Sequence, residues 1–477
     1  MKNTQSHKTI IISAYRNVSI RYLLYGEILD QLIESGLRVV VLVNEENLDY
    51  YINKFKDKKI IIEPIFYFKN LRTLRSRLGS VLNTYRLCTS PQGKKINKNT
   101  TVDIFKKIYK KEWSENIKGY GVFLLILLVS NVASKSLLIR NLMIKLESLI
   151  FKGKQYDNLF KKYDPELLIV SSVGHMLDLY IMNSSKRNNT KIMTIFHNWD
   201  GPTTKGYRAN EIDYAVVWNQ TMKKEVEIYQ DISRDRIFVG GCSNYDIFFN
   251  QNTYFNTKKT FFDYFQLDSN KKTILYAPGG HNYFPNSLDT LEVILESITN
   301  NYYSSEVQVL LRGHPNSIGK EDVKKKIDLL LEKYGEHLKV SMPISKKLNF
   351  DVDLSMEDIK ILSDILSYSD LIVTQYSTLL IESSIFDLPA INSGIGYFRD
   401  FDDSAIMLDT LTHIKSINKY NAFDNVHSID ELNKCIEKYL VNPKVNSEER
   451  KNFSENLVGV NKGFSGKSIG KFIAEVA

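Results

Sequence analysis

The sequence predicts an α/β protein with two doubly wound parallel sheets in tandem, and three observations carry this prediction. Short apolar runs rich in β-branched residues alternate with amphipathic helical stretches in both halves of the chain. The length of 477 residues exceeds what one compact core holds, so two or three domains are expected. Hydrophobic residues at 43% and charged residues at 25% are ordinary globular values, which exclude a wholly disordered, collagenous or coiled-coil chain.

The first half opens with a strand, a helix and a second strand. Residues 9–12 form a short β-branched run, 22–35 carry leucine and isoleucine at helical spacing, and 38–43 form the next strand. Such a unit implies parallel strands joined by a right-handed crossover. The alternation resumes after residue 166, with strands expected at 167–172, 191–196, 214–218 and 236–241 and helices at 176–186 and 222–229.

The second half repeats this pattern after a polar stretch, 249–272, which is the expected linker. Strands are expected at 273–278, 307–315, 338–343, 371–377 and 388–394, the last closing the sheet, and helices at 288–300, 320–334, 356–368 and from 378 onward. We therefore expect a Rossmann-like N-terminal domain over 1–250, a second over 251–455, and a C-terminal segment, 456–477, that packs back on the first domain. The ligand site is expected in the cleft that the two domains face, at the carboxyl ends of the strands.

Positive charge is concentrated in one part of the first domain. The whole chain carries 63 Lys and Arg against 55 Asp and Glu, a net charge of +8. Residues 54–154 hold 22 of the basic and 6 of the acidic residues, a net charge of +16, and the remaining 41 basic and 49 acidic residues sum to −8. A basic insertion of about 54–154 is therefore set into an otherwise acidic protein.

Three interpretations of this insertion are open. Apolar residues from 123 to 150 with interleaved Lys135, Arg140 and Lys145 are typical of a helix that lies flat on an anionic membrane surface. The same pattern fits a buried helix with solvated lysines, and nucleic-acid binding is the weakest alternative because no recognised module accompanies the charge. The longest uncharged stretch, 16 residues after Lys118, is shorter than the ~20 residues that span a bilayer.

The predicted location is the cytoplasm, with peripheral attachment to the inner face of the cell membrane. Three scattered cysteines, Cys88, Cys242 and Cys435, suit neither a disulfide framework nor a cysteine zinc site. The polar start of the chain leads straight into a strand and does not have the pattern of a signal peptide.

Polar and glycine residues follow two of the predicted strands in the second half. Gly279, Gly280 and His281 follow the first strand, and two glycines allow backbone to approach a ligand closely. The end of the next strand carries Arg312, His314 and Pro315.

A later strand-to-helix turn carries two hydroxyl residues, Ser377 and Thr378. Hydroxyls and free backbone N–H groups at a helix N-terminus form an anion site that suits a phosphate. Glu382 lies on the same helical face as Thr378 and is placed to accept hydrogen bonds from ribose hydroxyls. Alternatively, Ser377 is an N-cap and Glu382 is a solvated helix charge.

In the first half, His197 and Asp200 come directly after the strand at 191–196. Either side chain could remove a proton from an acceptor hydroxyl. Alternatively, Trp199 anchors the core and Asp200 forms a turn with Gly201. The chain has neither a GxGxxG nor a GxxxxGK[ST] motif, and no His, Cys and carboxylate spacing suggests zinc, so we expect no cofactor and no metal.

These motifs resemble those of GT-B glycosyltransferases of bacterial surface polysaccharide assembly. That group includes capsule and lipopolysaccharide transferases and CDP-glycerol glycerophosphotransferase-like proteins. The likeness lies in the tandem halves, RGHP at 312–315, QYST at 375–378 with Glu382, and the segments 197–206, 218–231 and 238–248. It covers roughly 165–400 well and the first strand–helix–strand unit loosely, and the insertion has no counterpart.

The resemblance implies a GT-B fold and transfer from a nucleotide-activated donor to a hydroxyl of a surface glycan or lipid-linked glycan. By this likeness Arg312, His314, Ser377 and Thr378 serve the leaving group without an obligatory metal, and His197 or Asp200 serves the acceptor. The His-Pro pair with a later Ser-Thr pair is similar to the signature of bacterial sialyltransferases and Kdo transferases, which favours a CMP-activated acidic sugar. Trp199 occupies the place of one of the two acids that those sialyltransferases carry before glycine.

Three alternatives to a CMP-sugar transferase stay open. The nearest is a polyol-phosphate transferase that uses CDP-glycerol. A nucleotide-sugar 2-epimerase shares the double Rossmann-like fold but has no glycan acceptor. A non-catalytic scaffold would use the basic insertion to bind membranes or acidic polymers, although it would have no need of polar strand ends.

Overall fold

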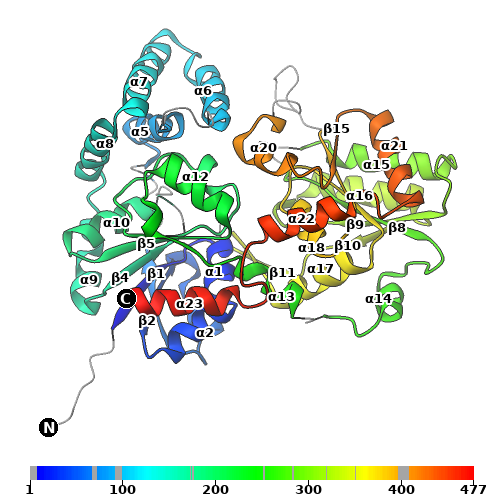
Figure 1. The fold of residues 1–477 in the computed structure, drawn as a ribbon, viewed down its shortest axis with the longest axis horizontal. Coiled ribbons are helices and arrows are strands. Elements are labelled where there is room, and N and C mark those ends of the chain that lie inside the picture. The colour runs from blue at the N-terminus through cyan, green and yellow to red at the C-terminus, as the bar shows by residue number, and fades with distance from the viewer. Residues whose placement is uncertain are drawn as a thin grey trace. The chain divides into compact units, whose positions relative to one another are not determined.

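The computed structural model describes residues 8–66, 72, 74–91, 99–171, 173, 177–250, 253–281, 284–317, 320–349, 351–395 and 408–477. The chain divides into two compact units, each built on a parallel sheet (Figure 1). The first unit comprises 1–244, 411–413 and 459–477, and the second comprises 245–410 and 414–458.

The first unit contains a seven-stranded sheet in the order β3-β2-β1-β4-β5-β6-β7, and all of its pairings are parallel. Its central strands consist of Ile, Val and Leu residues that are buried on both faces. This burial is characteristic of parallel sheets that helices cover on two sides. The strands are β1 Thr9–Ser13, β2 Arg38–Asn44, β3 Ile60–Ile65, β4 Leu167–Val170, β5 Lys191–Ile195, β6 Tyr214–Val217 and β7 Ile237–Val239.

The second unit contains a six-stranded parallel sheet in the order β10-β9-β8-β13-β14-β15. The strands are β8 Lys272–Ala277, β9 Val307–Arg312, β10 Leu338–Ser341, β13 Leu371–Thr374, β14 Ala390–Ser393 and β15 Asp424–Val426. An antiparallel hairpin of β11 Ser345–Leu348 and β12 Asp351–Leu354 follows β10. The prediction that 388–394 closes the sheet was wrong, because β15 lies outside β14, and its three residues are too few to show a period.

Each sheet has a topological switch point that confirms the doubly wound prediction. Strand β1 pairs with β2 on one side and with β4 on the other, and β8 likewise pairs with both β9 and β13. Ligands of such sheets bind outside the carboxyl ends of the strands at this point.

One predicted helix of the first unit is two helices in the structure. The stretch 22–35 was predicted as one helix, but the structure has α1 Asn17–Leu24 and α2 Glu27–Glu34. Gly26 between them has an extended backbone and occupies the N-cap of α2, which interrupts the helix. The C-terminal helix α23, Ser465–Val476, packs on α2 (Figure 1). The other helices that cover this sheet are α3 Leu48–Lys54, α9 Asp157–Tyr163, α10 Asp178–Arg187, α11 Gly201–Thr204 and α12 Gln220–Gln230.

Four further helices of the first unit form a group outside its sheet, drawn in blue to cyan in Figure 1. They are α5 Arg77–Cys88, α6 Thr100–Trp113, α7 Ile117–Lys135 and α8 Leu137–Ile150, and we call them the helical insertion. The predicted start at residue 54 was too early, because β3 falls within the basic block and yet pairs with β2. By length and composition, α7 could cross a membrane, and a third of its apolar window is buried in the protein.

The helices of the second unit follow the predicted alternation, with additional helices at 246–249, 258–265 and 412–418. Helix α14, Lys258–Phe265, lies within the stretch predicted as a linker and buries three phenylalanines, Phe261, Phe262 and Phe265. Phenylalanines at this helical spacing bury one face of the helix, although the residues around them are polar. The remaining helices are α13 Asp246–Phe249, α15 Ser287–Thr299, α16 Glu321–Tyr334, α17 Met356–Tyr368, α18 Leu379–Ile385, α20 Thr412–Asn418, α21 Ile429–Val441 and α22 Ser447–Leu457.

Candidate functional site

The first unit has a pocket at its switch point. The residues that line it follow the carboxyl ends of β1, β4 and β5 or belong to the short helix after β5: Tyr15, Arg16, Ser171, Phe196, His197, Asn198, Gly201 and Lys205. Of the two catalytic residues predicted in this half, His197 lies in the lining and Asp200 stands beside it at the start of α11. We call this site the His197 pocket.

His197 is enclosed by this pocket and by two basic side chains. Burial, followed by the charges of Arg16 and Lys205, lowers the pKa of its imidazole to about 4, although Asp200 acts in the opposite direction. Its Nδ1 is buried and has no hydrogen-bond partner among the described residues. At neutral pH the imidazole is therefore uncharged and can accept a proton.

The carboxylate of Asp200 is bound by side chains of the short helix that it precedes and of the residue after that helix. Its carboxylate accepts a hydrogen bond from the Thr204 hydroxyl at 2.7 Å and forms an ion pair with Lys205 at 3.4 Å. Burial alone would raise the pKa of Asp200, but Lys205, His413 and Thr204 together hold it well below its ordinary value. This carboxylate is already engaged by Thr204 and Lys205, so His197, which lines the pocket, is the better candidate for proton removal.

Three residues near this pocket were not among the predicted site residues. Arg16 follows β1, Lys205 follows α11, and His413 is far away in sequence but belongs to the first unit. The His413 ring meets the buried Trp199 ring edge-on at 4.9 Å, so Trp199 is a packed core residue as the alternative allowed. The position of Arg16 directly after a predicted strand is a signal that could have found it, whereas nothing local identifies His413.

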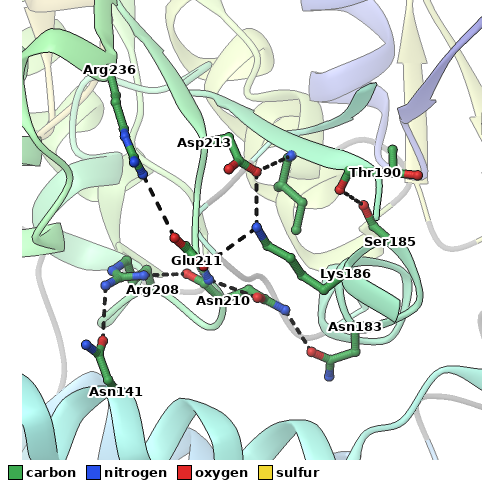
Figure 2. A network of polar contacts seen from close by, with 11 residues as sticks. Asn141, Asn183, Ser185, Lys186, Thr190, Arg208, Asn210, Glu211, Asp213 and Arg236 are labelled. Carbon is green, nitrogen blue, oxygen red and sulfur yellow. Dashed lines mark hydrogen bonds and ion pairs between the residues drawn. The ribbon is translucent and has the colours of Figure 1, made fainter. Parts of the chain in front are cut away.

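A polar network fixes the segment that runs from Lys205 to β6 (Figure 2). Asp213 accepts hydrogen bonds from the Ile192 backbone N–H at 2.8 Å and from Lys186 at 3.2 Å. Arg208 donates to the Asn210 carbonyl at 2.9 Å and to the Asn141 side chain at 3.3 Å. The network thus attaches this segment to β5 and, through Asn141, to helix α8 of the helical insertion.

In the second unit, the loops after β8 and β13 are joined by a hydrogen bond. The Gly279 N–H donates to Gln375 Oε1 at 2.9 Å, and Gln375 also donates to the Ile395 carbonyl at 2.6 Å. A Cβ on Gly279 would lie 2.5 Å from Phe284 Cδ2, so this position needs glycine. Gly280 follows, and its carbonyl accepts the Phe284 N–H.

Arg312 is buried and holds other parts of the protein. Its guanidinium donates two hydrogen bonds of 2.6 Å to the Asp358 carboxylate and one of 2.9 Å to the Ser341 hydroxyl. Asp358 also accepts the Ile344 N–H at 2.7 Å. The role of Arg312 on the leaving group stays a prediction, and its donors already bind the end of β10 and the first turn of α17.

His281, His314 and Pro315 lie close to one another at the ends of β8 and β9. His281 and His314 line a small pocket together with Gly313, Ser317 and Met342. His281 pairs with the exposed Asp322 at 3.2 Å. His314 is half-buried, and burial followed by the charge of Lys320 lowers its pKa, so it is neutral near pH 7. Pro315 begins the turn that follows.

The turn after β13 positions the predicted hydroxyls and carboxylate. Tyr376 has a left-handed backbone (φ 49°), and its hydroxyl donates to Asp409 at 2.7 Å. Ser377 Oγ accepts the Leu379 N–H at 3.3 Å, but the N-cap residue of the following helix is Thr378, so the alternative that Ser377 is the N-cap was wrong by one residue. Thr378 precedes α18, and Glu382 is half-buried one turn later.

The strands β9, β8 and β13 are neighbours, so their three predicted loops meet at one edge of the sheet. A wider groove of the second unit runs along β10 and carries none of these loop residues. Within the described ranges, no group of three or more His, Cys, Asp or Glu side chains could hold a metal ion.

Comparison with solved structures shows the fold. The chain is similar to S. aureus MnaA bound to UDP, with a TM-score of 0.55, 11% identity and coverage of 97% of this chain and 94% of that one. A putative UDP-N-acetylglucosamine 2-epimerase from Listeria monocytogenes gives a TM-score of 0.56 at 11% identity, covering 99% and 98%. A glycosyltransferase from Rickettsia africae gives 0.50 at 13% identity, covering 99% and 98%. These neighbours confirm the predicted GT-B-like fold.

Comparison with family models identifies the class of protein. No curated protein matches the sequence significantly. The model of the CDP-glycerol:poly(glycerophosphate) glycerophosphotransferase family matches residues 142–475, which is more than half of the chain. This match favours the predicted alternative, a CDP-glycerol-type transferase, over the leading prediction of a CMP-sugar transferase. The chain is therefore a transferase of GT-B fold that belongs to the CDP-glycerol:poly(glycerophosphate) glycerophosphotransferase family.

Proposed function

We propose that this protein transfers glycerol phosphate, or a similar polyol phosphate, from a CDP-activated donor to a terminal hydroxyl of an anionic polymer. The observation that carries the proposal is the His197 pocket, where a neutral imidazole lies in the field of Arg16 and Lys205. A base surrounded by positive charge suits an acceptor hydroxyl whose neighbouring groups are phosphates.

The reaction is a substitution at phosphorus. The acceptor hydroxyl oxygen attacks the phosphorus of the glycerol phosphate group and forms the new phosphodiester bond. The bond from this phosphorus to the oxygen that bridges it to the cytidine phosphate breaks, and CMP leaves with that oxygen. The proton of the hydroxyl passes to the imidazole of His197 and then to solvent. Positioning and charge stabilisation supply most of the rate enhancement in such transfers.

Substrate charge would also tune the base. In the free protein, Arg16 and Lys205 disfavour the protonated imidazole of His197. A phosphate bound between these two cations would offset their charge and would raise the pKa of His197 from about 4 towards neutrality. The base would then become stronger when an anionic substrate is present.

The second unit would bind the donor through the loops after β8, β9 and β13. Gly279 and Gly280 offer a loop without side chains, and His314 and Thr378 offer polar groups beside it. Glu382 is the proposed partner of the ribose hydroxyls. Arg312 would act indirectly, because its ion pair with Asp358 fixes the backbone that leads to His314.

A donor panel tests this function. Purified full-length protein would be incubated with a glycerol phosphate oligomer and with CDP-glycerol, a CMP-activated acidic sugar or UDP-N-acetylglucosamine, and the released nucleotide would be measured by chromatography. We expect CMP release from CDP-glycerol only when the oligomer is present. Turnover of the CMP-sugar, or epimerisation of UDP-N-acetylglucosamine, with CDP-glycerol left intact would overturn the proposal.

A further inference from the structure

The turn after β13 contains a residue whose backbone conformation is unfavourable for its side chain. Tyr376 has a φ of 49°. This is the left-handed region, which glycine enters at no steric cost and which a bulky residue enters only under strain. Such a residue keeps its conformation only where the surrounding structure holds it, and strained residues cluster at functional sites. The contacts of Tyr376 therefore show what the protein gains from a tyrosine at this position.

The aromatic ring of Tyr376 packs on the loop after β8. It stacks on the ring of Phe284, with the two centroids 5.9 Å apart and the two planes 11° from parallel. Phe284 is buried, its N–H donates to the Gly280 carbonyl, and its ring lies 2.5 Å from where a Cβ of Gly279 would stand. The ring of Tyr376 thus supports the glycine loop that we propose for the donor.

The backbone of Tyr376 is held by the two strands that follow β13 in the order of the sheet. Its N–H donates to the side-chain oxygen of Asn392 in β14 at 2.8 Å. Asn392 is buried, and its side-chain N–H donates in turn to the side-chain oxygen of Asn425 in β15 at 2.7 Å. The left-handed conformation at residue 376 is therefore fixed by side chains of the sheet itself.

The hydroxyl of Tyr376 reaches a pair formed by a carboxylate and a histidine. It donates to one oxygen of Asp409 at 2.7 Å, and the other oxygen lies 2.7 Å from Nε2 of His427. The side chains of His427 and Asp409 are 27% and 22% exposed, so water screens these contacts only in part. His427 directly follows β15, and its backbone N–H donates to the Glu431 carboxylate at 2.8 Å. We call Tyr376, Asp409 and His427 the Tyr376 anchor.

The Tyr376 anchor is adjacent in the chain to two of the residues predicted for the donor. Ser377 and Thr378 follow Tyr376 directly, and α18 begins at the next residue. A φ of the ordinary negative sign at residue 376 would turn the chain that leads to both hydroxyls in another direction. The contacts that hold Tyr376 therefore also decide where Ser377 and Thr378 lie.

We propose that the Tyr376 anchor positions the donor-binding turn: it holds the left-handed conformation in which Ser377 and Thr378 meet the phosphates of the nucleotide. The proposal rests on the proposed function in one respect, namely that the donor binds at the carboxyl ends of β8, β9 and β13. Asp409 and His427 act through Tyr376 and need not touch the donor. Donor affinity would thus depend on two side chains that lie in other loops of the second unit.

Nucleotide affinity of the purified full-length protein tests this proposal, with CDP and UDP as probes in isothermal titration calorimetry. Tyr376→Phe removes the hydroxyl and keeps the ring that stacks on Phe284, and it should raise the Kd of CDP by about fivefold or more. Asp409→Ala should raise it by a similar factor. The double variant should bind CDP within about twofold of Asp409→Ala, because both changes remove the same hydrogen bond.

A matched control and a conservative variant separate positioning from general stability. The hydroxyl of the buried Tyr303 donates to Asn433 at 2.7 Å, and Tyr303 lies before β9, away from the carboxyl ends of the strands. Tyr303→Phe should lower the melting temperature at least as much as Tyr376→Phe and leave the Kd of CDP unchanged. His427→Ala should weaken CDP binding, and His427→Gln, which keeps an N–H donor for Asp409, should restore most of the affinity.

Three results would overturn the proposal: wild-type CDP affinity in both Tyr376→Phe and Asp409→Ala, an equal loss of affinity in Tyr303→Phe, or wild-type protein that binds neither nucleotide. Tyr376→Gly removes the backbone strain together with the side chain, so wild-type affinity in this variant would also contradict a role for the tyrosine. Wild-type protein that binds UDP but not CDP would contradict the proposed donor alone. A loss of UDP affinity in Tyr376→Phe, with none in Tyr303→Phe, would then still support the Tyr376 anchor.

Discussion

The two units use the same strand order in different ways. In each sheet, the three strands that come first in the chain lie on one side of the switch point and the later strands lie on the other. Both sheets carry polar residues at the carboxyl ends beside this point. In the second unit the polar side chains there are paired within the protein, as Arg312 is with Asp358 and His281 with Asp322. In the first unit the charges of Arg16 and Lys205 act instead on an uncharged His197.

This difference suits the proposed division of work between a donor site and an acceptor site. Paired side chains and a hydrogen-bonded turn fix backbone, which a site for a constant nucleotide would need. A base kept neutral by burial and by nearby cations would respond to the charge of what binds, which an acceptor site for an anionic polymer would need. Changing one group in each unit tests whether the two sites differ in this way.

The largest effect is expected at His197. His197→Gln should lower kcat by about 10²- to 10⁴-fold, because it removes the proton acceptor, and should leave donor affinity unchanged. Steady-state kinetics with CDP-glycerol measures both. Asp200→Asn is the comparison, and we expect a smaller loss because Asp200 acts through α11. A larger loss of kcat in Asp200→Asn than in His197→Gln would make Asp200 the base.

The next effect is expected at the buried ion pair of the second unit. Asp358→Ala leaves the Arg312 charge buried without its partner, so the free energy of unfolding should fall by about 3–5 kcal/mol. Lys434→Ala, which removes an exposed ion pair with Asp430, should cost less than about 1 kcal/mol. Denaturant titration measures both. Similar stability in the two variants would show that the Arg312 pair does not fix this region.

Acid should weaken the first unit through its two buried histidines. Burial lowers the pKa of both His197 and His413 to about 4, so the unfolded chain takes up protons at these positions below pH 6.5 while the folded one does not until about pH 4. Stability is therefore lost as pH falls through this window, by about 2 kcal/mol per histidine between pH 8 and pH 5. His413→Gln should make the decline measurably shallower in denaturant titrations at several pH values, and an unchanged slope would contradict this origin.

The smallest effect is expected at Arg16. Arg16→Gln should raise the KM for a phosphate-bearing acceptor about tenfold, as for the loss of one charge-assisted hydrogen bond. It should also move the kinetic pKa of His197 upward, because one of the opposing charges is gone. Arg38→Gln, at the opposite end of the sheet where β2 begins, is the control and should change neither value. An unchanged acceptor KM would remove Arg16 from the acceptor site.

Sequence periodicity predicted most of the two sheets because their strands are short β-branched runs separated by amphipathic helices. It missed β15, which has three residues, and it joined α1 to α2 across Gly26. It also placed the start of the insertion too early. Strand β3 is flanked by basic residues in the sequence, but it pairs with β2 within the sheet. Such errors arise where pairing between distant segments decides the structure.

The candidate site was predictable where it follows strands directly. His197, Gly279 and His314 could be identified because each comes just after an apolar run. Arg16, whose charge acts on His197, was missed although it directly follows a predicted strand, and His413, which acts on Asp200, lies more than 200 residues away in sequence. The ion pair between Arg312 and Asp358 could not be predicted either. It gives Arg312 a partner within the protein, whereas the sequence alone assigned this residue to the donor.

The position of the donor phosphorus in the products shows whether the acceptor attacks phosphorus, as we propose, or carbon. CDP-glycerol labelled in the phosphate next to glycerol would be incubated with the purified protein and a glycerol phosphate oligomer, and the label would be located in the products. Attack on phosphorus predicts that the label enters the polymer as a phosphodiester and that CMP is released unlabelled. When carbon is attacked, as in glycosyl transfer, the label stays with the released nucleotide. That result would contradict substitution at phosphorus.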